Sequence, residues 1–244
     1  MTQPTLLAVS GASGGLGAST LALALGRCLA RAGPPVVVAD LDLAGGGLEV
    51  TAGVEHLPGR RWDDLREVRG RVPAARLLAT LPGEAGCHVL SGLGGARPEV
   101  APEVVLEVVD SLLAGGVSVV LDLPVRGPLL ADVMARAPVL VVVTALRTRG
   151  LADAEACVER ALAVAPESRA DPVLLLVTRG GRATTDVLDD VVAHLGVPHV
   201  HHVRDDPAVA RGGERGAFPG VSRDAVRACA EAVVAALPGI AVAS

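Results

Sequence analysis

Lysine and tyrosine are both absent from this 244-residue chain, which contains one tryptophan and one phenylalanine. Every side chain that stays positive at all physiological pH values is therefore an arginine. This excludes mechanisms that need a lysine amine or a tyrosine phenol. Because 50% of the residues are hydrophobic but only 1% are aromatic, the core has to be built of valine, leucine and alanine. Such a composition suits buried parallel strands.

Long apolar runs, paired cysteines and an excess of positive charge are also missing. The longest apolar stretches, such as Val139–Val143, are far shorter than the ~20 residues that cross a bilayer. The four cysteines are far apart and form no C-x-x-C pair, which favours free thiols over a disulfide or metal set. A net charge of −5 provides no overall field for nucleic acid. We expect a soluble, cytoplasmic protein that binds neither membrane nor DNA directly.

The most informative stretch is the glycine-rich segment Gly11–Thr20, GASGGLGAST. It follows the apolar run Thr5–Val9 and precedes a helix predicted over residues 21–32. Strand, glycine loop and helix in this order favour phosphate binding, because backbone N–H groups can close around an anion at the positive end of the helix. The sequence therefore predicts a phosphate-binding loop.

Two kinds of ligand fit this loop. Gly11, Gly15 and Gly17 have the spacing of a dinucleotide-binding loop, with Asp40 placed to hold a ribose hydroxyl. The missing tyrosine and lysine exclude the chemistry of short-chain dehydrogenases, but a non-catalytic dinucleotide-binding domain stays open.

The second alternative is a P-loop. Residues 12–20 match the pattern G-K-G-G-x-G-K-S/T, except that Ala12 stands at its first glycine and Ser13 and Ala18 replace its two lysines. Later acids favour this interpretation. Asp40 and Asp42 follow a buried strand, and Asp122 ends the apolar run 117–123 as a Walker B acid does. Since parallel strands end at one edge of a sheet, these acids are expected near the loop, where carboxylates can hold Mg²⁺ through water.

Apolar strands and amphipathic helices alternate along the whole chain. We predict an α/β fold with a doubly wound, mostly parallel sheet of about seven strands and helices on both faces, as a single domain over residues 1–244. Trp62 is expected to be a packing anchor, the arginines from 60 to 76 to lie on a solvated helix face, and Ser222 to cap the last helix.

Taken together, the chain resembles the MinD/ParA family of deviant Walker A ATPases, and within it the CpaE/TadZ-like branch that includes actinobacterial septum-site-determining proteins. The matching segments are GGLGAST, VVVADLDLAGGGLEV, GRRWDDL, VVLDLP and RDDPAVARGGERG. The resemblance implies a protein that positions pilus or secretion machinery or the division septum, recruited by its protein partners to the inner face of the membrane or to a cell pole. Many members carry a receiver-like domain ahead of the P-loop, which we expect this chain to lack.

The resemblance also implies roles for individual residues. Asp42 would orient the attacking water, Ser19 would hold Mg²⁺ with Asp40 and Asp122 nearby, and Thr178 would stand where the family uses an asparagine to read adenine. The implied nucleotide-binding residues are Ser13, Gly14, Gly15, Leu16, Gly17, Ala18, Ser19, Thr20, Thr178 and Arg179.

The two missing lysines weaken these expectations. A charge-assisted contact to phosphate is worth ~1.5–3 kcal/mol, so we expect weak or no binding of ATP and Mg²⁺ and slow or no hydrolysis. Any dimer should be independent of nucleotide, because the family's cross-dimer lysine is replaced by Ser13. Three functions stay open: a positioning protein with a degenerate P-loop, a slow ATPase switch in which an arginine replaces the lysine, and a non-catalytic dinucleotide-binding domain.

Overall fold

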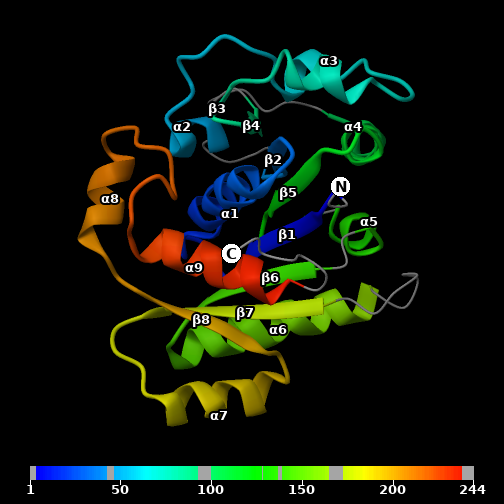
Figure 1. Ribbon diagram of the computed structural model, residues 1–244. Helices are drawn as coiled ribbons and strands as arrows, with labels where there is room; N and C mark the ends of the chain where they lie inside the picture. Colours follow the sequence, from blue (N-terminus) through cyan, green and yellow to red (C-terminus); the bar gives the residue numbers. More distant parts are fainter. Residues whose placement is uncertain are drawn as a thin grey trace.

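A single sheet organises the protein in the computed structural model, which describes residues 4–42, 47–92, 100–127, 129–136, 139–164 and 173–237 (Figure 1). The eight strands lie in the order β3-β4-β2-β5-β1-β6-β7-β8, and all neighbours are parallel except β3 and β4. The strands are β1 (Leu6–Gly11), β2 (Val36–Asp40), β3 (Gly83–Glu84), β4 (Cys87–Leu90), β5 (Ser118–Leu123), β6 (Val139–Ala145), β7 (Val173–Gly180) and β8 (His199–Arg204).

This sheet confirms the predicted fold class and corrects one detail. The additional strand β3 is two residues long, too short to leave a periodic pattern in the sequence. Strand β5 lies between β2 and β1. In the dinucleotide-binding fold the first two strands are neighbours, so the order seen here is a different one and argues against the dinucleotide interpretation.

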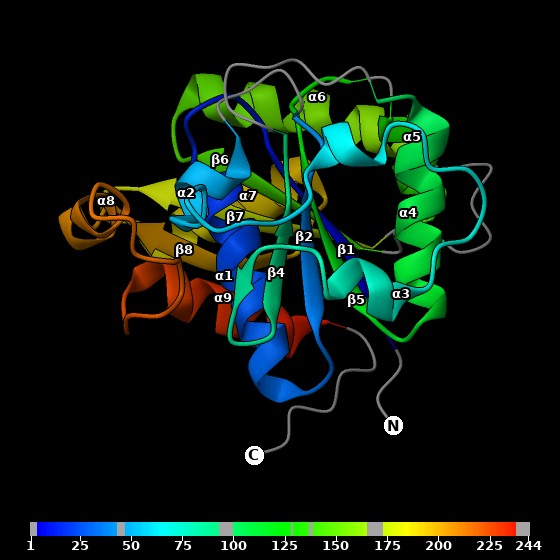
Figure 2. The same ribbon diagram turned by 90° about the horizontal axis from the view of Figure 1, so that it is seen from above.

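Helices cover both faces of the sheet, as predicted (Figure 2). Apolar residues of α1, α2 and α9 pack on one face, and those of η1, α3, α4, α5, α6 and α7 on the other. The helices are α1 (Ala18–Ala32), α2 (Leu48–Ala52), the 3-10 turn η1 (Trp62–Leu65), α3 (Ala74–Leu78), α4 (Pro102–Ala114), α5 (Leu130–Met134), α6 (Thr148–Val164), α7 (Thr185–Leu195), α8 (Pro207–Gly213) and α9 (Ala225–Ala236).

The sequence missed short elements and misplaced one cap. Helices α2, α3 and α5 have five residues each, so none repeats an apolar position often enough to be recognised. The arginine-rich stretch 60–76 is only partly helical, which corrects the expected helix face. The cap of α9 is Asp224, whose carboxylate accepts the N–H of Arg227 at 2.9 Å, and not Ser222.

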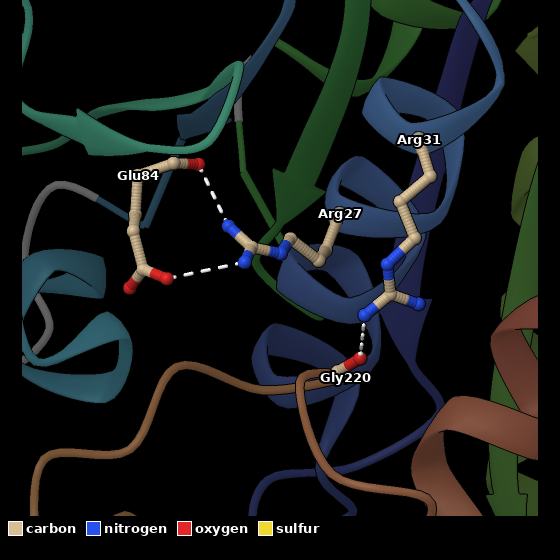
Figure 3. A network of polar contacts seen from close by, with 4 residues as sticks. All are labelled: Arg27, Arg31, Glu84 and Gly220. Carbon is tan, nitrogen blue, oxygen red and sulfur yellow. Dashed lines mark hydrogen bonds and ion pairs between the residues drawn. The ribbon is translucent and has the colours of Figure 1, made fainter.

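Arginines of α1 fasten this helix to two loops on its outer side (Figure 3). Arg27 donates to the backbone oxygen of Glu84 at 2.8 Å and to its carboxylate at 3.1 Å. Arg31 donates to the backbone oxygen of Gly220 at 2.6 Å. These bonds connect α1 to the β3–β4 turn and to the segment that leads into α9.

Helix α1 lies unusually close to the sheet at Gly26. A methyl group there would overlap the Val38 side chain and lie 3.0 Å from the sulfur of Cys87, one of four free cysteines. Both neighbours are fully buried, so neither can give way easily. Gly26 is therefore required by packing, although glycine lowers helix propensity.

We predict that Gly26→Ala destabilises the protein by about 1–3 kcal/mol, because overpacking outweighs the gain in helix propensity. Urea unfolding followed by the fluorescence of Trp62, the single tryptophan, measures the effect. Gly181→Ala is the matched control, since a methyl group there meets no atom within 4 Å. Equal stability of the two variants would contradict the close packing of α1.

Candidate functional site

The glycine-rich segment forms the turn that the sequence predicts, between the end of β1 and the start of α1. The N–H of Ala12 donates to the backbone oxygen of Val143 at 2.8 Å, and that of Leu21 to Gly17 at 2.9 Å. Gly17 has φ 85° and caps the helix in a left-handed conformation that favours glycine. The loop backbone therefore lies at the N-terminus of a 15-residue helix, where anions are stabilised.

An arginine from a distant strand lies against this loop. Nη1 of Arg179, near the end of β7, is 3.3 Å from the position that a Cβ on Gly17 would occupy. The guanidinium also pairs with Asp205, with Nε and Oδ1 2.8 Å apart. Positive charge is thus present beside a loop whose two lysine positions are Ser13 and Ala18. Arg179 is thus one of the implied nucleotide-binding residues that the structure brings to the loop.

A cavity of about 440 Å³ opens next to the loop. Four predicted nucleotide-binding residues line it: Leu16, Gly17, Thr20 and Arg179. The other loop residues stand outside its lining; they are Ser13, Gly14, Gly15, Ala18 and Ser19. The structure therefore brings Leu16, Gly17 and Thr20 of the loop to a cavity that is partly open to solvent.

Most of the remaining lining comes from the last quarter of the chain, at the side of the molecule where α8 projects (Figure 1). Leu21, Thr51, Val143 and Val177 complete it. Residues from the end of β8, from α8 and from the segment before α9 contribute, among them Val209, Phe218 and Arg223. Sequence analysis assigned none of these to the site. The one available signal was the segment RDDPAVARGGERG, which carries part of the wall.

Thr178 is not brought to this cavity. Val177 and Arg179 line it, so the alternation of a strand turns Thr178 to the other face of the sheet. Its hydroxyl is fully buried there, 2.9 Å from His199 Nε2 and 2.9 Å from His202 Nδ1. Thr178 therefore contacts the histidines of β8 and not the glycine loop.

Two acids meet at the carboxyl ends of neighbouring strands. Asp40 of β2 is paired in register with Asp122 of β5, and both are only 4% exposed. Burial raises the pKa of Asp122 to about 7; the hydroxyl of Ser19 beside it opposes this shift, and the charges of Asp40 and Asp42 add to it. The predicted proximity of Asp122 and Ser19 is thus present in the structure.

Asp40 holds its own surroundings together. One carboxylate oxygen accepts the N–H of Asp42 at 2.9 Å, and the other accepts the N–H of Leu48 at 3.0 Å and the hydroxyl of Ser91 at 2.7 Å. Burial raises the pKa of Asp40 above its usual value, and these three hydrogen bonds reduce the shift without cancelling it. Its backbone oxygen accepts the indole N–H of Trp62 at 2.8 Å. Trp62 is fully buried, which confirms it as a packing anchor.

Asp42, the predicted water-orienting residue, has its side chain exposed while its N–H is held by Asp40. Together these residues fit a nucleotide with Mg²⁺. A Cβ on Gly14 or Gly15 would meet no atom within 4 Å, so the loop leaves room for phosphate there. Arg179 supplies positive charge, and Ser19 and Asp122 are oxygen donors of the kind that Mg²⁺ prefers. Asp40 fits as the residue that supports this edge, since both of its carboxylate oxygens are occupied.

Comparison with known proteins gives one kind of curated relative. An uncharacterized protein of Mycobacterium tuberculosis is 33% identical over 234 residues, which cover 96% of this chain and 64% of the relative. The chain therefore spans about two thirds of the length of that protein.

Solved structures of low identity share the fold. A ParA family ATPase from Chlorobium tepidum superposes with a TM-score of 0.78 at 14% identity, over 95% of this chain and 98% of the other. The septum site-determining protein MinD from Pyrococcus horikoshii, complexed with Mg-ADP, gives 0.73 at 18% identity over 96% of both chains. A chain of the MinC:MinD cell division protein complex from Aquifex aeolicus gives 0.70 at 16% identity, over 97% of this chain and 98% of the other.

At this level of identity, such superpositions establish the architecture alone. The amino-acid sequence also matches a protein family. Residues 7–219 match the family model described as CobQ/CobB/MinD/ParA nucleotide binding domain. This match covers most of the chain, including the glycine loop, the acids of β2 and β5, and Arg179. The chain belongs to the MinD/ParA group of nucleotide-binding domains.

Proposed function

We propose that this protein binds ATP with Mg²⁺ weakly if at all, hydrolyses it slowly or not at all, and works as a positioning protein of the CpaE/TadZ/MinD type. The observation that carries the proposal is the guanidinium of Arg179 beside Gly17, at the cavity next to the glycine loop. In a chain without lysine, a guanidinium in this position can still offer the loop positive charge for a phosphate.

Binding would combine three features of the site. Loop amides and the helix N-terminus provide donors for phosphate oxygens. Thr20 adds a hydroxyl at the cavity, and the apolar walls, including Val209 and Phe218, can enclose a nucleoside. A cavity of about 440 Å³ has the size of typical small-molecule sites.

Arg179 is a weaker anchor than a P-loop lysine because it already has a partner. It forms an ion pair with Asp205, and the two side chains are 40% and 60% exposed. An ion pair this exposed contributes little to stability. A phosphate would nevertheless have to compete with Asp205 for the guanidinium. This competition is consistent with weak binding.

Mg²⁺, when bound, would neutralise charge on the nucleotide phosphates. Ser19 and Asp122 are the residues that would hold it, directly or through water. Because the pKa of Asp122 is raised to about 7, its carboxyl would lose a proton on binding the cation at neutral pH. Asp40 would act as a positioning residue, and the exposed carboxylate of Asp42 would orient water.

A positioning role is supported by what similar proteins are. One solved relative is named a septum site-determining protein, and another is a complex of MinD with MinC. We propose protein partners from a pilus, secretion or division machinery, a cytoplasmic location with recruitment through those partners, and a dimer that does not require nucleotide. Among the described residues, no helix is long and apolar enough to cross a membrane.

The second candidate is a slow ATPase switch of the same family. The same contact between Arg179 and the glycine loop favours it, since positive charge near the phosphates assists phosphoryl transfer. Nucleotide binding is common to both candidates, and the rate of hydrolysis separates them.

The first prediction concerns Arg179. Arg179→Ala should weaken Mg-ATP binding by about tenfold to a hundredfold, the worth of one charge-assisted phosphate contact. Isothermal calorimetry, with thermal melting as a second readout, measures the affinity. Arg182→Ala is the control, because Arg182 is exposed and does not line the cavity. Unchanged affinity in Arg179→Ala would remove the observation on which the proposal rests.

The second prediction concerns Asp122 in the protein without nucleotide. Its folded pKa lies above its unfolded pKa, so stability from this group is lost as the pH rises from about 4 through 7. Asp122→Asn should therefore stabilise the protein at pH 8 by ~2–4 kcal/mol and have little effect near pH 4. Urea unfolding at both pH values tests this, with exposed Asp189→Asn as control. A stability difference independent of pH would be the contrary result.

The third prediction concerns hydrolysis. We expect phosphate release from ATP well below roughly 1 per second, because neither lysine position carries a lysine. Asp42→Ala should abolish the remaining activity while Mg-ATP affinity changes by less than about threefold. Turnover near 1 per second that Asp42→Ala abolishes would establish the ATPase switch instead, and full activity in Asp42→Ala would exclude Asp42 as the water-orienting residue.

A further inference from the structure

A second hollow lies away from the nucleotide cavity, between η1 and α3. It has a volume of about 200 Å³, and apolar side chains form its walls. Its lining consists of Arg60, Leu65, Val68, Val72, Arg76, Leu77 and Thr80. We call it the arginine groove, because Arg60 and Arg76 stand at its rim and both are exposed.

Hydrogen bonds to the rest of the fold hold the groove in shape. The N–H of Arg60 donates to the backbone oxygen of Thr80 at 2.7 Å, which joins its two ends. The N–H of Val72 donates to the hydroxyl of Ser111 on α4 at 3.1 Å. Leu65 and Leu77 belong to the buried core. The groove is therefore a preformed feature and not a gap between loose segments.

The charge of this segment is opposite to that of the whole chain. Residues 60–76 contain six arginines and three acids, while the chain has a net charge of −5. Five of these arginines are exposed; they are Arg60, Arg66, Arg69, Arg71 and Arg76. None of the five is ion-paired with a carboxylate in the part of the chain that the structure describes. This surface thus offers unneutralised positive charge around an apolar hollow.

That combination selects the kind of partner. Binding to double-stranded DNA or to a phosphate surface needs positive charge but no apolar hollow. Stacking on the bases of single strands needs exposed aromatic side chains, and the single tryptophan is fully buried. Apolar walls with a basic rim complement a helix that has leucine-like residues on one face and acids beside them. We propose that the arginine groove docks an acidic, amphipathic helical segment of a protein partner.

The groove and the nucleotide cavity lie at different sides of the molecule. In both views α3 is well separated from α8, which borders the cavity (Figures 1 and 2). The proposal does not depend on nucleotide binding, so its failure and that of the proposed function can be told apart.

The experiment is a fluorescence anisotropy titration with a labelled amphipathic helical peptide. One peptide carries leucines on one face and glutamates beside them, and a matched peptide carries lysines in place of the glutamates. We expect the acidic peptide to bind at least about tenfold more tightly, and its affinity to fall with added salt. A 20-base-pair DNA duplex and phosphatidylglycerol vesicles are titrated in parallel.

Charge reversal localises the binding. The double variant R60E/R76E should weaken the acidic peptide by at least about tenfold. The control R182E/R215E, which changes two exposed arginines outside the groove by the same charge, should not. Val68→Ser tests the contribution of the apolar wall and should also weaken binding of the acidic peptide. Thermal melting of each variant verifies folding.

Three outcomes would overturn the proposal. The first is equal binding of the acidic and lysine peptides, or no binding of either. The second is equal loss of affinity in the groove and control variants. The third is tighter binding of DNA or vesicles that R60E/R76E abolishes, which would assign the surface to phosphate groups.

Discussion

The buried carboxylate of Asp40 is the interaction on which this edge of the sheet depends. It accepts two backbone N–H groups and one hydroxyl, and its own backbone oxygen accepts the indole of Trp62. A buried charge is tolerated only when it is paired or hydrogen-bonded, and these three donors meet that requirement. As a result, Asp42, the start of α2, the segment after β4 and the turn η1 are all bonded to a single residue, the first three through its side chain and η1 through its backbone oxygen.

The second constraint is where positive charge can stand. In a chain whose only permanent cations are arginines, a glycine loop without its lysines keeps the backbone donors but loses charge of its own. Arg179 reaches the loop from the end of β7, two strands away from β1 in the sheet. A side chain on Gly17 would be strained by the left-handed backbone, and its Cβ, 3.3 Å from Nη1, would shift the guanidinium slightly. The fold therefore brings a cation beside the glycine loop from a distant strand.

Acids and arginines are distributed unevenly over the protein. Asp40, Asp42 and Asp122 gather at the carboxyl ends of β2 and β5, and the shared burial and charge raise the pKa of Asp122. Positive charge concentrates instead over residues 60–76, around an apolar hollow. Trp62 connects the two regions physically, since its indole binds Asp40 and it opens the turn that leads into the arginine groove.

Much of this could be predicted from sequence because it is local. Apolar runs that end in Asp40 and Asp122 mark buried parallel strands, and in such a sheet the carboxyl ends necessarily meet at one edge. Alternation of strands and helices therefore predicted the α/β fold, the loop between β1 and α1, and the acids beside it. The five-residue helices α2, α3 and α5 and the two-residue strand β3 were missed, because a helical period needs two turns or more to become visible.

The tertiary structure alone decided which side chains meet. Strand β5 lies between β2 and β1 in the sheet. This order is visible only in the folded structure, because it depends on how the connections pass over the sheet. One residue of register decides that Arg179 lies on the cavity side and Thr178 on the other, where two histidines hold it. Asp224 rather than Ser222 caps α9 for a similar reason, because the cap is set by the path of the preceding chain. The amino-acid sequence determined the helices, the strands and the backbone of the glycine loop. Tertiary packing determined that Arg179 lies beside this loop, because contacts between distant strands produce no periodic pattern in the sequence.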